Sequence, residues 1–322
     1  MTAEIFNVTK ENFVSKALDV FQYQWNNNSL YNKYCRLRNI ERQDVTDITH
    51  LPFLPVEFFK SHKVVSFTGQ EEMIFSSSGT TGMNASRHFV KSLDLYEQSF
   101  SSGFSHFYGD PRQYAFLCLL PSYLERTGSS LIYMADQLIK MSGNPDSGFF
   151  LKATGALSEI LSRREKLGLR TFLLGVTFAL LDFAESTFLR LNHTIIMETG
   201  GMKGRREELT RLQVHDLLIK AFHVEAIHSE YGMTELLSQA YSKGMGRFTC
   251  PPWMKVLVRK EDDPFYVSTT GTGMLCIIDL ANVHSCAFIE SSDLGRVYED
   301  GSFEVLGRMD NSDIRGCSLL VL

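Results

Sequence analysis

Residues 76 to 82 read Ser-Ser-Ser-Gly-Thr-Thr-Gly, and this stretch is the most informative part of the chain. Its small side chains and two glycines let the backbone approach a ligand closely, and its N–H and hydroxyl groups can converge on phosphate oxygens. No lysine follows Gly82, so the stretch does not fit the Walker pattern GxxxxGK[ST]. Alone it is equally typical of a flexible polar turn. The later segments have to distinguish a phosphate-binding loop from such a turn.

Two further segments follow apolar, strand-like runs. Residues 227 to 236 read Ile-His-Ser-Glu-Tyr-Gly-Met-Thr-Glu-Leu and supply an aromatic ring, a glycine, a hydroxyl and a carboxylate that suits Mg²⁺. Alone, Thr234 could simply cap a helix that starts here, with Glu235 in its first turn. Residues 197 to 202, Met-Glu-Thr-Gly-Gly-Met, place paired glycines where they could approach a flat ring or form an ordinary turn.

The last two segments are Ser-Asp-Leu-Gly at 292 to 295 and Gly-Arg-Met-Asp at 307 to 310. The carboxylate of Asp293 suits the two hydroxyls of a ribose, and the planar donor fork of Arg308 suits phosphate or ribose oxygens. Taken singly, each segment also fits a turn that carries a surface charge pair.

The composition limits the classes of protein to which this chain can belong. The 322 residues are 44% hydrophobic and 21% charged, which is enough to bury a sizeable core. The net charge of −5 and the lack of a basic patch predict no nucleic-acid partner. The longest apolar stretch, residues 172–181, is too short to span a bilayer, so no membrane span is expected. With no signal-peptide pattern and no CxxC pair among the six cysteines, a cytoplasmic location is expected.

The order of segments predicts an α/β fold. Residues 1–50 read as a helical preamble, residues from about 51 to 270 as an α/β core, and residues from about 271 to 322 as a mostly β part. Within the core, short apolar runs alternate with amphipathic stretches such as 156–166 and 205–222. Asp300-Gly301 predicts the turn of a hairpin.

In their order, these segments resemble the motifs of the adenylate-forming superfamily, which contains acyl- and aryl-CoA ligases and luciferases. Within it, the chain more closely resembles the acyl-protein synthetases, the fatty-acid-activating component of the bacterial luminescence fatty-acid reductase. Three segments carry this closer resemblance over nearly the whole chain: Leu-Pro-Phe-Leu-Pro-Val-Glu-Phe-Phe-Lys-Ser-His-Lys at 51 to 63, Glu-Thr-Gly-Gly at 198 to 201, and Ser-Asp-Ile-Arg-Gly-Cys at 312 to 317. The resemblance implies the large N-terminal domain of an adenylate-forming enzyme, with layered sheets and helices.

The resemblance also implies roles for particular residues. Tyr231 would stack on adenine, with Gly232 beside it, and Thr234 would contact the α-phosphate of ATP. Glu235 would hold Mg²⁺, Asp293 would bind the ribose hydroxyls, and Arg308 would bind ribose or phosphate. The base pocket would be lined by Gly200 and Gly201, and the phosphates would be wrapped by Ser77, Ser78, Gly79, Thr80, Thr81 and Gly82.

The sequence departs from the superfamily in two places. The lysine that usually follows the phosphate loop is missing, and Arg87 is the nearest substitute, with a different donor geometry. Only residues 309–322 remain after Arg308, so the usual small C-terminal domain is expected to be absent. In the family this arrangement implies acylation of a cysteine near the C-terminus, which makes Cys317 the candidate catalytic nucleophile. Alternatively, Cys317 is a buried strand residue.

The sequence therefore predicts a ligase that forms carbon–sulfur bonds. It would activate a fatty or aryl acid with ATP and Mg²⁺, release pyrophosphate, and pass the acyl group to a protein thiol for hand-over to an acyl reductase or acyl-carrier partner. Two alternatives stay open: a ligase that transfers the acyl group to coenzyme A or a carrier protein, and a degenerate nucleotide-binding subunit that serves as a scaffold.

Overall fold

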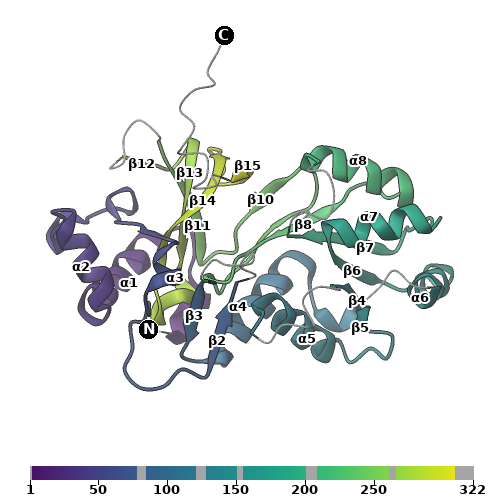
Figure 1. Ribbon diagram of the computed structural model, residues 1–322, viewed down its shortest axis with the longest axis horizontal. Coiled ribbons are helices and arrows are strands. Elements are labelled where there is room, and N and C mark those ends of the chain that lie inside the picture. Colours follow the sequence, from purple (N-terminus) through teal and green to yellow (C-terminus); the bar gives the residue numbers. More distant parts are fainter. Residues whose placement is uncertain are drawn as a thin grey trace, which may run out of the picture. The chain divides into compact units, whose positions relative to one another are not determined.

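The computed structural model describes residues 2–77, 85–120, 128–150, 155–200, 209–260 and 266–308. The chain divides into two compact units (Figure 1). Unit 1 combines Met1–Gly69 with Pro252–Leu322, and unit 2 is Gln70–Pro251. The first and last parts of the sequence therefore fold together, with unit 2 inserted between them.

The helices of unit 1 come from its N-terminal segment. They are α1 (Phe13–Asn27), α2 (Ser29–Leu37) and α3 (Phe58–Ser61), with the 3-10 turns η1 (Thr2–Asn7), η2 (Arg42–Asp44) and η3 (Ile48–His50). One face of α1 is buried, and its members recur at helical spacing: Phe13, Ala17, Val20, Phe21, Gln24 and Trp25. Asn28 begins α2, because its side chain accepts a hydrogen bond from the N–H of Tyr31 at 2.9 Å.

The strands of unit 1 come mostly from its C-terminal segment. They are β11 (Met254–Arg259), β12 (Val267–Ser268), β13 (Gly271–Asp279), β14 (Phe288–Val297) and β15 (Phe303–Arg308), in the antiparallel order β12-β11-β13-β14-β15. The short β1 (Leu54–Pro55) pairs parallel with β14, and η5 (Leu280–His284) follows β13. The rings of Phe21 and Tyr31 pack on Phe288, with centroid distances of 6.3 and 6.0 Å, so the N-terminal helices share a core with β14.

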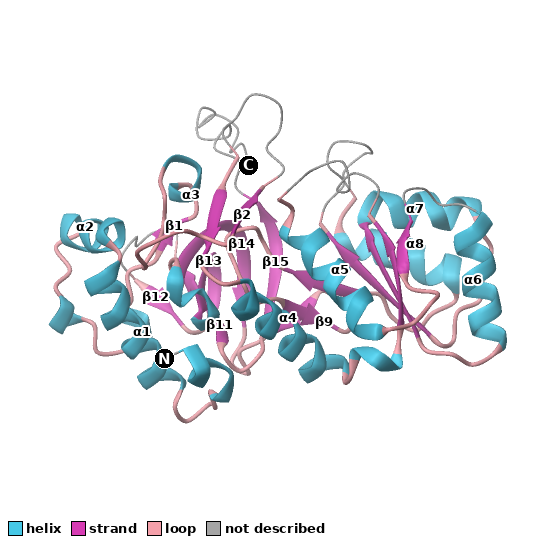
Figure 2. Cartoon of the chain, turned by 90° about the horizontal axis from the view of Figure 1, so that it is seen from below, coloured by secondary structure: helices cyan, strands magenta, loops and turns pink. Residues whose placement is uncertain are grey.

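Unit 2 is built on a parallel sheet flanked by helices (Figures 1 and 2). Its parallel strands, in the order β5-β4-β6-β7-β8, are β5 (Gly148–Phe150), β4 (Ala115–Leu119), β6 (Thr171–Val176), β7 (Thr194–Thr199) and β8 (His228–Tyr231). The antiparallel β9 (Ala240–Ser242) and β10 (Arg247–Thr249) extend it beyond β8. The carboxyl ends of the parallel strands lie at one edge, which is where ligands bind in open α/β sheets.

The remaining elements of unit 2 surround this sheet. The helices are α4 (Leu93–Tyr108), α5 (Ser130–Ser142), α6 (Gly155–Lys166), α7 (Thr177–Ser186) and α8 (Arg211–Phe222), with the 3-10 turn η4 (Pro111–Gln113). The strands β2 (Met73–Ser76) and β3 (Arg87–Val90) form a separate antiparallel pair. All residues of β4 and β6 are buried, as expected for central parallel strands.

The expectation of an α/β fold is confirmed. The hairpin expected at Asp300-Gly301 connects β14 to β15, and Gly301 takes the positive φ of +81° that its turn requires. Of the helices in the described ranges, none has both the length and the apolar character needed to cross a membrane.

Candidate active site

The Ser/Thr/Gly stretch begins at Ser76, the last residue of β2, and the structure describes its stem. The N–H of Ser77 donates to the carbonyl of Ser86 at 3.0 Å, and the Ser77 hydroxyl accepts from the Ser86 N–H at 2.9 Å. These two bonds close the base of the loop, so the Ser77 hydroxyl helps to form the loop. The expected phosphate ligands Ser78, Gly79, Thr80, Thr81 and Gly82 lie outside the described residues.

The segment with Tyr231, Gly232, Thr234 and Glu235 leaves the carboxyl end of β8. Tyr231 is buried and makes an edge contact with the ring of Phe248, with centroids 5.9 Å apart. The alternative that Thr234 caps a helix is wrong, because the chain turns there and enters β9 at Ala240 without forming one. Glu235 is 5% exposed, so its carboxylate is removed from most of the solvent.

The loop stem and this turn are brought together by one hydrogen bond. His88, on β3 just after the loop, donates from Nδ1 to the carbonyl oxygen of Thr234 at 2.9 Å. The side chain of His88 is buried, which shields the bond from water. Two of the segments that the sequence singles out, 146 residues apart, are therefore neighbours.

The glycine segment follows β7, the strand next to β8. Gly200 is exposed and has a φ of +73°, a conformation that favours glycine. Its carbonyl oxygen accepts a hydrogen bond from the hydroxyl of Thr177, at the start of α7, at 3.0 Å. Gly201 lies outside the described residues.

A buried carboxylate, Glu198, lies directly beneath this glycine turn. It accepts hydrogen bonds from the hydroxyls of Thr177 and Ser229 at 2.9 and 3.0 Å. The Nε of Arg211 and the Nε2 of His215, both on α8, lie 3.4 and 3.7 Å away. Burial raises the pKa of Glu198, but hydrogen bonding from His215 and the charge of Arg211 outweigh it and hold the pKa below its usual value. Glu198 is therefore ionised, and its carboxylate oxygens are occupied by these neighbouring donors.

A second carboxylate, Glu230, lies opposite Thr199 in the β7–β8 register and accepts a hydrogen bond from its hydroxyl. Burial, with a smaller contribution from Glu198, raises the pKa of Glu230 to about 7. Its Oε1 packs so closely on Gly232 that a Cβ at that position would collide with it. An alanine at position 232 would therefore force the Glu230 carboxylate to move.

Gln239 adds an unsatisfied polar group to this edge of the sheet. It is 6% exposed, its Cγ lies 3.4 Å from the position a Cβ on Gly232 would take, and its buried Oε1 has no hydrogen-bond partner within the part of the chain that the structure describes. A buried acceptor without a donor is costly, and it points to a ligand or water. The sequence analysis gave no role to Glu198, Glu230 or Gln239, because their environments come from residues distant in the sequence.

The last two segments lie in unit 1. Asp293 on β14 and Arg308 on β15 are paired in the antiparallel register, and their Oδ1 and Nε atoms are 4.0 Å apart. The Asp293 side chain is 18% exposed and that of Arg308 is 69% exposed. The two residues are therefore a weak, solvent-facing pair within a strand ladder. Cys317 lies outside the described residues.

Residues 5–98 match a family model described as acyl-protein synthetase, LuxE. The resemblance expected from the sequence is confirmed. The chain is also 21% identical to the long-chain-fatty-acid–luciferin-component ligase of Aliivibrio fischeri over 326 residues, covering 94% of this chain and 85% of the relative. This likeness to an acyl-protein ligase extends over both units.

Solved structures with the same fold include a 2-hydroxyisobutyryl-CoA ligase in complex with 2-HIB-AMP and CoA, with a TM-score of 0.64 and 12% identity, covering 94% of this chain and 70% of that one. ATP-bound MatB from Rhodopseudomonas palustris has a TM-score of 0.56 and 17% identity over 75% of this chain. The chain spans about half of MatB, 49% of its length. At this identity the likeness establishes the fold, which is that of the large domain of adenylate-forming enzymes.

Proposed function

We propose that the chain activates a fatty acid as its acyl-adenylate, using ATP, and then transfers the acyl group to a protein thiol. The observation that carries the proposal is the His88–Thr234 hydrogen bond, which joins the stem of the Ser/Thr/Gly loop to the turn after β8. A phosphate-binding loop and a base- and metal-binding turn have to be neighbours if they hold one nucleotide. The family match and the similarity to the ligase from Aliivibrio fischeri support the proposal that the chain is a ligase that transfers an acyl group.

In this proposal the edge of the parallel sheet binds the nucleotide. Residues Ser77 to Gly82 surround the phosphates, Tyr231 stacks on the adenine with Gly200 and Gly201 alongside, and Thr234 contacts the α-phosphate. Asp293 binds the ribose hydroxyls and Arg308 binds ribose or phosphate oxygens. Gln239 joins this set, since its buried Oε1 has no donor among the described residues and the amino group of adenine would supply one.

Mg²⁺ fits the site through Glu235 alone. The described residues hold no cluster of three His, Cys, Asp or Glu side chains that could form a metal cage. Mg²⁺ does not need one, because it commonly binds through one or two carboxylates together with water and the phosphates of the substrate. When bound, the ion would neutralise part of the phosphate charge.

The chemistry proceeds in two steps. A carboxylate oxygen of the acid attacks the α-phosphorus of ATP, and the bond from that phosphorus to the bridging oxygen breaks, releasing pyrophosphate. A thiolate then attacks the acyl carbon, which forms a thioester and releases AMP. The chain contributes positioning and N–H donors at the loop, and these stabilise the charge that develops on the phosphate oxygens.

The cysteines narrow the choice of nucleophile. Cys35, Cys118, Cys276 and Cys286 are buried, and burial raises the pKa of each thiol, that of Cys35 to about 12. Such thiols are poor nucleophiles at neutral pH. Among the described cysteines only Cys250 is partly exposed. Cys317 remains our candidate acceptor, and Cys250 provides a matched control.

The test is intact-protein mass spectrometry after incubation with ATP, Mg²⁺ and a panel of fatty and aryl acids. Wild type and Cys250→Ala should gain the mass of one acyl group, labile to hydroxylamine, and Cys317→Ala should gain none. Pyrophosphate release is measured in the same tubes.

Two outcomes would replace the proposal with another function. Pyrophosphate release without any protein acylation, together with a thioester formed on added coenzyme A or carrier protein, would indicate a ligase with an external acceptor. No pyrophosphate release with any acid would indicate a nucleotide-binding scaffold. If the acyl group does reach Cys317, an acyl reductase that accepts a protein thioester is the partner to seek.

A further inference from the structure

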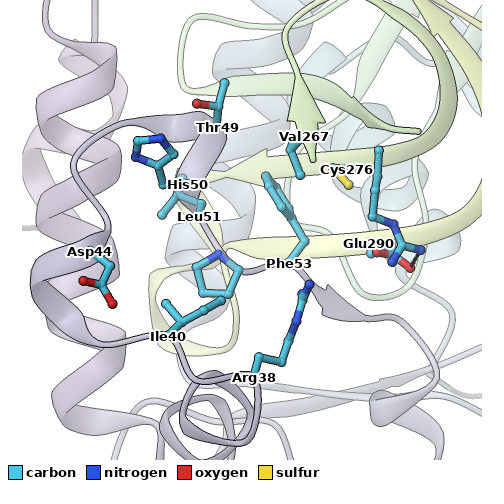
Figure 3. A pocket seen from close by; sticks show the side chains of 12 residues that line it. Arg38, Ile40, Asp44, Thr49, His50, Leu51, Phe53, Val267, Cys276 and Glu290 are labelled. Atoms are coloured by element: carbon cyan, nitrogen blue, oxygen red, sulfur yellow. Dashed lines mark hydrogen bonds and ion pairs between the residues drawn. The ribbon is translucent and has the colours of Figure 1, made fainter. Parts of the chain in front are cut away.

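Unit 1 contains a cavity of about 240 Å³ that the nucleotide proposal does not use (Figure 3). It lies between the segment that links α2 to β1 and the sheet formed by β11, β12, β13 and β14. Every residue that lines it belongs to unit 1.

One part of the cavity wall is apolar. Leu51, Pro52 and Phe53 are buried at the approach to β1, and Val267 of β12 and the side chain of Ile40 complete this part of the lining. Both prolines in the Leu-Pro-Phe-Leu-Pro sequence keep the backbone extended, so the segment lies along the sheet and does not coil away from it. The wall favours an aliphatic ligand by burying its surface.

The rest of the lining is polar, with two guanidinium groups, Arg38 and Arg259, and two carboxylates, Asp44 and Glu290. Arg259, the last residue of β11, donates from Nη2 to Glu290 Oε1 on β14 at 2.5 Å. Arg38 caps the C-terminal end of α2 and donates from Nη1 to the hydroxyl of Tyr34 at 3.0 Å. The charges of both guanidinium groups act on the partly buried carboxylate of Glu290. Figure 3 shows Asp44 on the opposite side from Glu290, where its Oδ2 accepts from the N–H of Glu41.

Arg259 also offers a donor that the described part of the protein does not use. Its Nε is buried within the fold and has no hydrogen-bond acceptor among the described residues. A guanidinium presents its donors in a planar fork that matches the two oxygens of a carboxylate. A ligand oxygen at this point would satisfy a group that otherwise carries a desolvation cost.

We infer that this cavity binds a short-chain monocarboxylic acid, with the carboxylate toward Arg259 and Arg38 and the hydrocarbon chain against Phe53, Ile40 and Val267. Its volume of about 240 Å³ is below the roughly 300–1,000 Å³ of pockets that hold drug-sized ligands, which favours a short acid such as hexanoate. This site is distinct from acid activation, because none of the residues that we assign to the nucleotide or to acyl transfer lines the cavity.

The test is a titration of the full chain with hexanoate, without ATP, followed by methyl NMR of isoleucine and valine. The methyl signals of Ile40 and Val267 should shift in a saturable manner, because both side chains line the cavity. The neutral 1-hexanol should bind at least about ten-fold more weakly, since it lacks the charge that a guanidinium pairs with.

Three variants sharpen the test. Arg38→Gln removes one cation and should weaken hexanoate binding about ten-fold. Arg259→Lys retains a positive charge beside Glu290 but lacks the Nε donor, and it should also weaken binding. Arg36→Gln is the matched control on the same helix: Arg36 is exposed, bonds to Asn32 and lies over the ring of Trp25, so its loss should leave hexanoate affinity unchanged.

Several results would overturn the inference. They are the absence of saturable shifts at Ile40 and Val267, equal binding of hexanoate and 1-hexanol, and unchanged affinity in Arg38→Gln. Hexanoate that shifts Ile227, which precedes β8 in unit 2, but not Ile40 or Val267 would likewise exclude this cavity. If Arg259→Lys disturbs folding, Arg38→Gln decides alone. Because no ATP is present, the result does not depend on the proposed acyl transfer.

Discussion

At the scale of single residues, two glutamates on neighbouring strands have pKa values shifted in opposite directions. Glu198 on β7 is surrounded by donors and by Arg211, so its pKa is lowered. Glu230 on β8 has one hydroxyl donor, from Thr199, and has Glu198 nearby, so burial raises its pKa to about 7. The two pKa values differ because more donors and positive charge surround Glu198 than Glu230.

The raised pKa of Glu230 predicts a pH dependence of stability. Its folded pKa of about 7 exceeds the ordinary 4.5, so the folded protein keeps a proton that the unfolded chain releases. Stability therefore falls as pH rises from 4.5 to 7. In Glu230→Gln this loss is removed, which we expect to raise Tm relative to wild type by several degrees at pH 8 and much less at pH 5.

The measurement is thermal unfolding of both proteins at the two pH values. Glu159→Gln, an exposed change on α6, serves as the control and should behave as wild type at both. A difference between Glu230→Gln and wild type that is the same at pH 5 and pH 8 would contradict the raised pKa.

At the residue level, the sequence allows a prediction only where a motif names the residue. Tyr231 and Thr234 could be singled out because they belong to a pattern of fixed spacing. Glu198 lies within a quoted segment, but its partners Thr177, Arg211 and His215 lie 13 to 21 residues away on two helices. A carboxylate acquires its environment from such distant contacts, and local patterns do not contain them.

At the scale of elements, the segment Ser-Asp-Leu-Gly shows how packing decides between a turn and a strand. The alternative expectation of a turn at residues 292 to 295 is wrong, because these residues continue the ten-residue strand β14. The pairing with β15 shifts register between Leu294 and Gly295. A glycine belongs at such an irregularity, where a neighbouring backbone approaches closely.

We predict that Gly295→Ala destabilises unit 1. A Cβ there would lie 2.5 Å from both the carbonyl oxygen of Glu304 and Cδ2 of Leu275, so the strands would have to separate. We expect a loss of roughly 2 to 3 kcal/mol in the free energy of unfolding. Gly307→Ala on the partner strand meets no atom within 4 Å and should change stability by less than about 0.5 kcal/mol. Equal thermal unfolding of the two variants would refute this reason for the glycine.

The strands were the most predictable elements. The apolar runs around β4, β6 and β13 marked them correctly, because buried strands need continuous apolar sequence. The apolar run at residues 224–227, in contrast, ends just before β8 begins at His228. The possible helix after Thr234 was wrong, since Leu236 and Leu237 are buried and the chain reverses into β9. There, tertiary burial overrides the local signal.

At the scale of the whole molecule, unit 1 is assembled from segments about 180 residues apart. Gln24 of α1 is one of its main connections. Its Nε2 lies within hydrogen-bond distance of the carbonyls of Asn282, Val283 and Ser285 at 3.0 to 3.3 Å, and its Oε1 accepts from the N–H of Ala287 at 3.0 Å. A single buried side chain thus ties the N-terminal helix to the loop before β14.

We predict that Gln24→Leu, which has a similar size, costs roughly 3 to 5 kcal/mol. It removes the partners of one buried N–H and up to three buried carbonyls. Gln22→Leu, whose side chain bonds only to the exposed Arg42, should cost less than about 1 kcal/mol. Chemical unfolding monitored by tryptophan fluorescence suits the comparison, because both tryptophans, Trp25 and Trp253, lie in unit 1. Similar losses in both variants would contradict the special role of Gln24.

The pairing of the first and last segments could not be predicted from sequence. Periodicity and turn residues describe a chain in linear order, and they gave a helical start, an α/β middle and a β end. The contact between Phe21 and Phe288 joins the two outer parts, but nothing in either aromatic residue specifies the other as its partner. Such a pairing depends on the shape of the complete core.

This interrupted unit has a consequence for synthesis on the ribosome. Translation at about 5–20 residues per second needs roughly 10 to 40 s to pass through Gln70–Pro251 before the first strands of the C-terminal segment follow. During that delay the aromatic face of α1 has no sheet to pack on, whereas unit 2 is continuous and can fold as soon as it emerges. Nascent chains halted at residue 251 should therefore bind strongly to a chaperone that recognises exposed aromatic helices.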